Sequence, residues 1–301
     1  MNKVAILTGG TSAEREIALT SAKTVAKALE GRVEISTFDF PTEIDLFLSK
    51  RGEFNVAIPV FHGKGGEDGT VQGFLETLGI PYLFSGVAAH AVAMDKDLAK
   101  RIVSSVGIKT APWKILTKAS DRAVLSIPCV VKPVDGGSTQ GVSIVRDREE
   151  LDRTLDEAFQ YSSRVIIEDF IAGDEFTVAV AEDSGESVAL PVIQIKSPDG
   201  FYDFNSKYGP QPAEKLCPAP IADDLAQRLQ SAALTAHNTI GARHLSRTDF
   251  IVTPSGEIYF LEINTIPGLS VLFPRAVAAS GRDFGDLLST WIDQVANSLH
   301  S

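Results

Sequence analysis

Over the first ninety residues, short apolar runs alternate with segments whose apolar positions recur every three or four residues. The apolar runs predict strands at residues 3–8, 33–38, 55–61 and 81–86. A helix is expected between the first two runs, with one apolar face formed by Ile17, Ser21, Val25 and Leu29. Strands separated by helices predict a parallel, doubly wound layer, which binds ligands at the carboxyl ends of its strands.

Two further units follow this layer. The second is expected to hold a helix over residues 91–106 that stops at Gly107, strands at 128–133, 141–145 and 164–170, and a helix at 147–161. The third is expected to hold strands at 175–182 and 187–195, a Pro/Gly-rich loop at 197–220, a helix at 223–240, a hairpin at 247–264 and two terminal helices. We therefore expect a mixed α/β (α+β) protein with domains at residues 1–90, 91–172 and 173–301.

Composition narrows the functional classes. The chain has 301 residues and a net charge of −11, which argues against a nucleic-acid partner because no basic stripe is present. No apolar run is long enough to span a bilayer, and the N-terminal apolar run is read as a strand rather than a signal peptide. Cys129 and Cys217 are far apart and lack metal-type spacing, so reduced thiols and a cytoplasmic location are expected.

The hairpin near the C-terminus carries a cluster of polar side chains. Strand alternation places Glu262 and Asn264 on one face, and Arg247 and Asp249 on one face of the partner strand. An antiparallel pairing across the turn PSGE brings Asp249 near Glu262. Two carboxylates and an amide oxygen suit Mg²⁺ bound together with phosphates. The alternative is a solvated outer face of the hairpin, which the apolar surroundings of FLEIN disfavour.

A lysine and a glycine-rich loop are candidates for phosphate binding. Lys132 ends an apolar strand, where a buried cation needs a partner. The loop after it contains Gly136, Gly137, Ser138, Thr139 and Gly141, whose backbone N–H groups can cradle phosphates. An ordinary glycine-rich hairpin explains this loop equally well. Lys96 is a less specific candidate, because lysines are common on exposed helices.

Other polar residues have both a structural and a functional interpretation. Thr11 and Glu14 have the spacing of a capping box at a helix start, which is the simpler reading of Glu14 from local sequence. His62 follows a strand and is either a polar loop residue or a ligand-binding one. Lys207 and Tyr208 lie in the long Pro/Gly-rich loop, a kind of connection that is often functional.

The motifs taken together resemble a known family over essentially the whole chain. They occur in the order GGTSAERE, FHGKGGEDGTVQG, MDK, VVKP, GGSTQGVS, EFTVAV, YDFNSKY, CPAP, RTDFIV and LEINTIPG. This set resembles the D-alanine–D-alanine ligase family of ATP-grasp enzymes. The resemblance implies a three-unit ATP-grasp fold that holds ATP between the second and third units. It also implies ligation of two D-alanines through an acyl phosphate, for peptidoglycan precursor synthesis.

The resemblance also assigns residues to the nucleotide and the metals. The residues implied in nucleotide binding are Lys96, Lys132, Ser138, Glu168, Phe170, Ile171, Glu175, Lys207 and Phe260. Asp249, Glu262 and Asn264 are implied as ligands of two Mg²⁺ ions, for which Mn²⁺ can substitute.

For the amino-acid substrates, the resemblance implies that Glu14 pairs with the ammonium of the first D-alanine, with His62 close by. Arg247 and the Gly268 N–H are implied to stabilise the tetrahedral oxyanion, and Ser270 is the hydroxyl left to hold the second carboxylate. The implied hydrogen-bonded trio that closes the site is Glu14, Ser138 and Tyr208. A homodimer is expected from the family.

Three positions bear on how far the resemblance extends. The segment LSVLFP after Gly268 is two residues shorter than in typical members, and Asp169 stands where a lysine is common. Tyr208 favours an amine over a hydroxy acid as second substrate. Two alternatives therefore stay open. One is a related ATP-grasp ligase with another D-amino acid or a cyclising substrate, and the other is a non-catalytic ATP-binding regulator.

Overall fold

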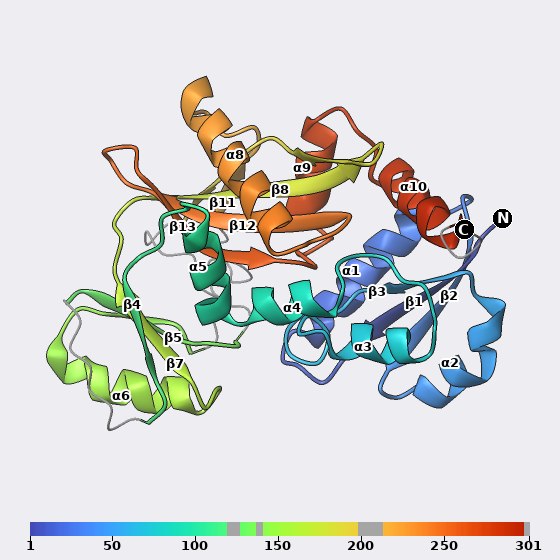
Figure 1. Ribbon diagram of the computed structural model, residues 1–301, viewed down its shortest axis with the longest axis horizontal. Helices are drawn as coiled ribbons and strands as arrows, with labels where there is room; N and C mark the ends of the chain where they lie inside the picture. Colours follow the sequence, from blue (N-terminus) through green and yellow to red (C-terminus); the bar gives the residue numbers. More distant parts are fainter. Residues whose placement is uncertain (119–126, 137–140, 198–212, 298–301) are drawn as a thin grey trace.

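The computed structural model describes residues 1–118, 127–136, 141–197 and 213–297, and their strands form three separate sheets (Figure 1). The N-terminal sheet is parallel, in the order β2-β1-β3, with strands β1 (Lys3–Gly9), β2 (Glu34–Phe40) and β3 (Val56–Pro59). Its helices are α1 (Arg15–Ala28), α2 (Ile44–Lys50), a 3₁₀ turn η1 (Arg51–Glu53) and α3 (Thr70–Thr77). The parallel layer is confirmed, but the run at 81–86 forms only one bridge, between Ala57 and Tyr82.

The second sheet is antiparallel and lies at one end of the molecule (Figure 1). Its order is β4-β7-β5-β6, with strands β4 (Trp113–Leu116), β5 (Cys129–Pro133), β6 (Ser143–Val145) and β7 (Val165–Asp169), covered by α6 (Arg148–Phe159). Strand β4 was not predicted from the sequence. One long helix over residues 91–106 was also wrong: the segment forms α4 (Val87–Met94) and α5 (Lys96–Ser105). The chain breaks at Asp95, which has an extended backbone and caps α5 through a bond from the Leu98 N–H.

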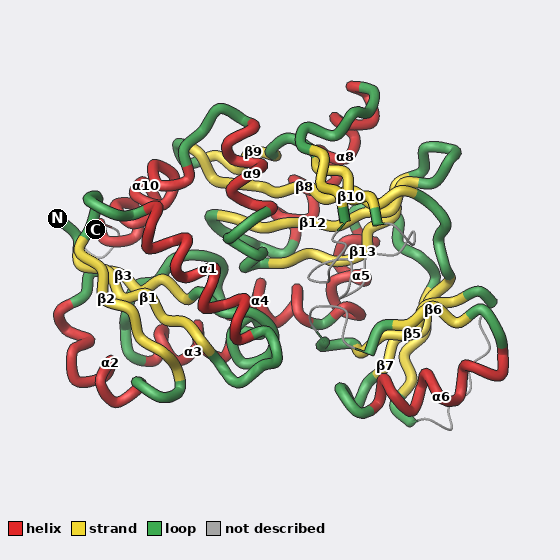
Figure 2. Tube along the Cα trace, turned by 180° about the vertical axis from the view of Figure 1, so that it is seen from behind, coloured by secondary structure: helices red, strands yellow, loops and turns green. Residues whose placement is uncertain are grey.

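The third sheet has six strands, with β11-β10-β8-β12-β13 in order and β9 paired to β8. The strands are β8 (Asp174–Asp183), β9 (Glu186–Ala189), β10 (Ile193–Lys196), β11 (Glu214–Leu216), β12 (Leu245–Val252) and β13 (Ile258–Asn264). The single strand expected at 187–195 is thus two strands, and β11 lies in the segment expected to be loop. The helices are α8 (Asp223–Thr239), α9 (Leu272–Ala279) and α10 (Phe284–Asn297), as Figure 2 shows from behind.

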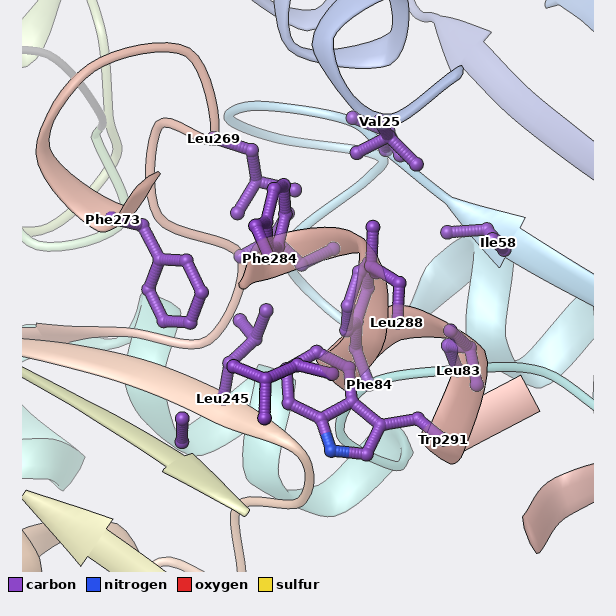
Figure 3. Packing of buried hydrophobic residues seen from close by; sticks show 14 of the residues in the cluster. Val25, Ile58, Leu83, Phe84, Leu245, Leu269, Phe273, Phe284, Leu288 and Trp291 are labelled. Atoms are coloured by element: carbon purple, nitrogen blue, oxygen red, sulfur yellow. The ribbon is translucent and has the colours of Figure 1, made fainter. Parts of the chain in front are cut away.

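The largest hydrophobic cluster joins the two ends of the chain. Val25 and Ile58 from the N-terminal layer pack with Phe84, Leu288 and Trp291, and we call this cluster the apolar joint (Figure 3). Its elements approach closely, since a Cβ at Gly285 of α10 would lie 2.3 Å from the carbonyl oxygen of Ala28. The domain boundaries expected near residues 90 and 172 stay a prediction.

Two expectations from composition can be compared with the described residues. Both cysteines are free thiols, with Cys129 buried and Cys217 half-buried. None of the helices in the described ranges has the length and apolar character needed to cross a membrane.

Candidate active site

A cavity of about 410 Å³ lies between the four-stranded and the six-stranded sheets. Most of the residues implied in nucleotide and metal binding line it, namely Lys96, Lys132, Glu168, Phe170, Ile171, Glu175, Asp249 and Glu262. They come from α5 and from strands of both sheets, or from the segment after β7. The fold therefore brings together residues that lie up to 166 positions apart in the sequence, from 96 to 262.

The β12-β13 hairpin carries the carboxylates of this cavity. Arg247 pairs with Asn264, and Asp249 pairs with Glu262, which confirms the predicted register. The Arg247 guanidinium donates to both Asp249 oxygens, at 2.9 and 2.7 Å. Thr177 Oγ1 donates a further bond of 2.5 Å to Asp249 Oδ1. The Asp249 side chain is therefore held rigidly at the cavity wall, at only 6% residue exposure.

A β-bulge decides which side chains of β13 face the cavity. The register shifts by one residue between Asp249 and Phe250, so Leu261 has no paired partner in the ladder. Leu261 and Glu262 both line the cavity. Phe260, implied as a nucleotide contact, is instead 1% exposed in the core, where it packs edge-on against Phe250. Phe260 is not among the described residues that line the cavity, because the bulge turns it away from Glu262.

Two lysines implied as phosphate ligands meet carboxylates in this cavity. Lys96 Nζ lies 3.5 Å from Glu262 Oε2 and donates a 2.6 Å bond to the Gly136 carbonyl. Lys132 Nζ lies 2.5 Å from Glu168 Oε1. The sequence argument that a lysine at the end of this buried strand needs a partner is confirmed, and Glu168 is that partner.

Sequence reasoning missed Lys100, which pairs with the other oxygen of Glu168. Burial lowers the pKa of Lys100 to about 8, an effect that the nearby charge of Lys132 reinforces and that of Glu168 opposes. Burial by itself would raise the pKa of Glu168, but the two lysines lower it overall and keep the carboxylate ionised. The sequence offered one sign that Lys100 lies near the site: it is four residues after Lys96, and residues four apart share a helix face.

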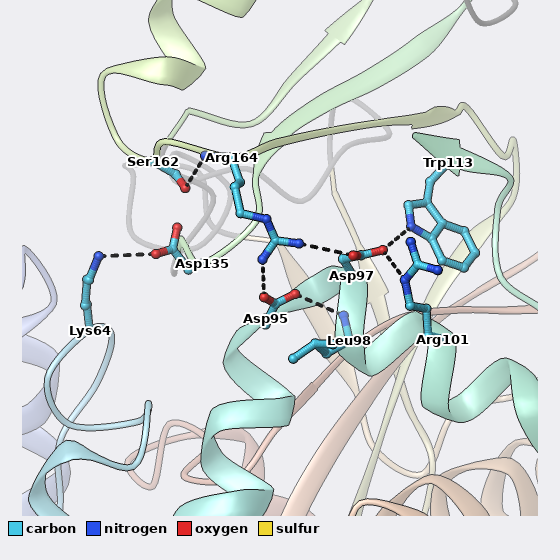
Figure 4. Close-up of polar contacts among 9 residues, drawn as sticks. All are labelled: Lys64, Asp95, Asp97, Leu98, Arg101, Trp113, Asp135, Ser162 and Arg164. Atoms are coloured by element: carbon cyan, nitrogen blue, oxygen red, sulfur yellow. Dashed lines mark hydrogen bonds and ion pairs between the residues drawn. The ribbon is translucent and has the colours of Figure 1, made fainter. Parts of the chain in front are cut away.

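The start of α5, where Lys96 sits, is anchored to the four-stranded sheet (Figure 4). Arg164 contacts Asp95 at 2.5 Å and Asp97 at 3.1 Å. The indole N–H of Trp113 donates a 2.8 Å bond to Asp97. Both neighbours of Lys96 are thus fixed, which limits where the lysine side chain can reach.

Glu14 and His62 lie where the N-terminal layer meets the C-terminal hairpin. Glu14 is the N-cap residue of α1 and makes no side-chain cap bond, so the capping-box interpretation is wrong. Its carboxylate lies beside Gly63, and it lines a second cavity of about 50 Å³ together with Lys96, Glu262 and Asn264. A second carboxylate, Glu67, also lines this cavity and was not predicted.

His62 is buried, at 5% exposure, and connects two units. Its Nε2 lies 3.0 Å from Ser21 Oγ, and Ser21 Oγ accepts a bond from the Leu269 N–H at 3.3 Å. His62 is not among the described residues that line either cavity, so its ligand-binding interpretation stays a prediction. Through Ser21, His62 is therefore linked to the segment that follows Gly268.

Residues 265–271 connect β13 to α9 and contain Gly268 and Ser270, both half-buried. Pro274 falls in the first turn of α9, where its missing N–H leaves no helical bond unmade. Thr265 Oγ1 lies 2.6 Å from His90 Nδ1, which anchors the beginning of the connection. Ser138, Lys207 and Tyr208 lie outside the described residues.

The donor set can be compared with the needs of a metal ion. Across the described ranges, no group of three or more His, Cys, Asp or Glu side chains is arranged to hold a metal. Two carboxylates and one amide are what the hairpin offers, with Asn264 Nδ2 3.5 Å from Asp249 Oδ2. Such an incomplete set of oxygens fits Mg²⁺, which keeps open positions for phosphates and water.

Comparisons with known proteins point to one family. Residues 102–293 match the model described as "D-ala D-ala ligase C-terminus", and residues 36–85 match "D-ala D-ala ligase N-terminus". The D-alanine–D-alanine ligase of Desulfotalea psychrophila is 40% identical over 303 residues, covering 97% of this chain and 94% of that protein.

Solved structures agree with this. The D-alanine–D-alanine ligase of Bacillus anthracis complexed with ATP superposes with a TM-score of 0.81 and 29% identity, covering 99% of this chain and 98% of that one. The VanG D-Ala:D-Ser ligase of Enterococcus faecalis has a TM-score of 0.83 and 28% identity, covering 98% and 99%.

Proposed function

The chain belongs to the D-alanine–D-alanine ligase family of ATP-grasp enzymes, and from that premise we propose which of its residues carry each part of the reaction. The protein is an ATP-dependent ligase that joins two D-alanines into D-alanyl-D-alanine for peptidoglycan synthesis. The location of the enzyme in the cytoplasm and its assembly as a homodimer are part of the proposal.

ATP binds in the 410 Å³ cavity between the two antiparallel sheets. Lys96 and Lys132 reach its phosphates, and Glu168, the segment at Phe170 and Ile171, and Glu175 hold adenine and ribose. This proposal is supported by one observation above the others. The cavity is lined by two lysines and the hairpin carboxylates, and also by apolar side chains. ATP requires both kinds of lining, because it has a charged triphosphate and an aromatic base.

Asp249, Glu262 and Asn264 are the residues that would hold two divalent ions. When bound, such ions neutralise the charge of the phosphates and assist transfer of the γ-phosphoryl group. Lys96 lies 3.5 Å from Glu262 and supplies positive charge at the same place.

The reaction needs two steps because a carboxylate is a poor acyl donor. A carboxylate oxygen of the first D-alanine attacks the γ-phosphorus, which forms an acyl phosphate and releases ADP. The amine of the second D-alanine, having lost a proton, attacks the acyl carbon, and inorganic phosphate leaves. Glu14 orients the first substrate by its ammonium. Arg247, held in place by Asp249, stabilises the oxyanion together with the Gly268 N–H.

The carboxylate of the second D-alanine binds near the first turn of α9. Ser270 is two residues before Leu272, the first residue of that helix, and its hydroxyl is the donor we assign to this carboxylate. Water would hydrolyse an acyl phosphate that is left exposed, so the reaction requires that water be excluded from the site.

Release of ADP from Mg-ATP tests this assignment against single and paired D-amino acids. We expect turnover with D-alanine alone and a D-alanyl-D-alanine product identified by mass spectrometry. The panel includes D-serine because a structurally similar ligase is named for that substrate. Turnover with D-alanine plus D-serine and none with D-alanine alone would overturn the choice of second substrate, whereas no turnover with any pair would support a regulator.

A further inference from the structure

The buried Lys100 has no role in the reaction as described above. Its side chain is 1% exposed, and it is not among the described residues that line the nucleotide cavity. A fully buried lysine is costly unless a negative charge compensates it. Any effect of Lys100 on the site therefore passes through the group that it contacts.

That group is Glu168, which two lysines share. Lys100 contacts one carboxylate oxygen and Lys132 contacts the other, at 2.5 Å for Lys132. Lys100 Nζ also lies 4.9 Å from the centroid of the Trp113 ring, a second favourable contact for the ammonium. The three charges join elements that pack in different cores. Lys100 is on α5, which packs against the six-stranded sheet through Ala99 and Val103, while Lys132 and Glu168 are on the four-stranded sheet.

The two lysines differ in whether their side chains can move away from Glu168. Lys132 lines the cavity, so it can turn from Glu168 toward a phosphate, whereas Lys100 is enclosed. If Lys132 turned away from a carboxylate with no other partner, Glu168 would be a buried, unpaired charge. The second lysine removes that penalty.

We propose that Lys100 is a positioning residue that keeps Glu168 paired, so that Lys132 is free to bind the phosphates of ATP. This rests on the proposed nucleotide site and adds to it a reason for the lysine pair. Without Lys100, ATP binding would force Lys132 to choose between Glu168 and the phosphate.

The variant Lys100→Met keeps the length and packing of the side chain and removes the charge. We expect its Kd for the non-hydrolysable analogue AMP-PNP with Mg²⁺, measured by calorimetry, to rise at least tenfold. The Kd for adenosine, which has no phosphates, should stay within twofold of wild type, because in the adenosine complex Lys132 still pairs with Glu168. A distorted cavity would weaken both ligands alike and would overturn the proposal. Lys27→Met, on the exposed face of α1, is the matched control.

A double-mutant cycle tests the route through Glu168. In the background of Glu168→Gln, the change Lys100→Met should raise the Kd for AMP-PNP by less than threefold, because residue 168 then carries no negative charge for Lys100 to keep paired. An undiminished effect in that background would overturn the proposal. Lys100→Arg, which keeps the charge, should restore most of the affinity, and thermal melting confirms that each variant is folded. Failure of the wild-type protein to bind AMP-PNP would instead contradict the proposed nucleotide site.

Discussion

The N-terminal layer and the four-stranded sheet are attached to the rest of the molecule in different ways. The N-terminal layer shares the apolar joint with α9 and α10, which includes Trp291 at 1% exposure (Figure 3). The four-stranded sheet has its own small core of residues from β4 to β7 and α6 among those described. We call its polar contacts to α5 and to the N-terminal layer the charged joint, made by Lys64 with Asp135, Arg164 with Asp95 and Asp97, and Lys100 with Glu168.

The two kinds of joint differ in how easily their geometry can change. Close apolar packing resists any change of geometry, because cores have little free volume. Ion pairs can be exchanged for pairs with a ligand at a smaller cost. Under the proposed assignment, the first D-alanine lies near the apolar joint and the nucleotide lies near the charged joint.

The largest expected effect comes from opening the apolar joint. Trp291→Ala should lower the free energy of unfolding by about 3–5 kcal/mol, because it removes a large, fully buried side chain and the bond from its indole N–H to the Glu182 carbonyl. Urea unfolding followed by circular dichroism measures this. Tyr161→Ala is the control, at a side chain that is 54% exposed. A loss below about 1 kcal/mol would show that the apolar joint is not the rigid one.

Removing a charge at the cavity should affect catalysis and spare the fold. Glu262→Gln is expected to lower kcat about a hundredfold or more. A neutral amide, unlike a carboxylate, cannot offset the positive charge of the divalent ions or of Lys96. The melting temperature should stay close to that of wild type. Glu257→Gln, at the exposed turn of the same hairpin, is the control. Near-normal activity of Glu262→Gln would refute the metal assignment.

Acid should weaken the apolar joint through a buried histidine. His244 stacks on Trp291, and burial, followed by the nearby charges of Arg243 and His237, lowers its pKa from 6.5 to about 3. Its Nδ1 accepts a 2.8 Å bond from the Phe84 N–H, which requires the neutral ring.

The sign of the pH effect follows from the lowered pKa. Between pH 6.5 and about 3 the unfolded chain binds a proton that folded His244 does not. The contribution of His244 to the free energy of unfolding is therefore fully present above pH 6.5, and stability falls as the pH drops through that window. Urea unfolding at pH 7, 5.5 and 4.5 should show a smaller decline in His244→Asn. An equal decline in both proteins would mean that other groups, such as His90 and His237, account for it.

The smallest effect is expected at the most exposed pair of the charged joint. Lys64 and Asp135 lie 3.2 Å apart, and the lysine side chain is 72% exposed. Lys64→Ala should change the free energy of unfolding by less than about 1 kcal/mol, because solvent screens such pairs. Thermal melting beside the control Lys50→Ala measures it. A decrease as large as that of Trp291→Ala would remove the distinction between the two joints.

Local patterns in the sequence determined much of the fold and part of the site. Alternation along two strands and one turn motif predicted that Asp249 faces Glu262, and the structure has that pairing. The parallel layer and the need of Lys132 for a partner were predicted in the same way. Such features depend on near neighbours in the chain, whose geometry is set by backbone periodicity.

Only the tertiary structure decided the rest. The partner of Lys100 is 68 residues away, and nothing near Lys100 in the sequence indicates it. The bulge at Leu261 turned Phe260 into the core, and the contacts of Arg164 accompany the break of the helix at Asp95. These outcomes depend on how three sheets pack and where buried charges find partners. That is a balance of desolvation and pairing between distant segments, which no local pattern contains.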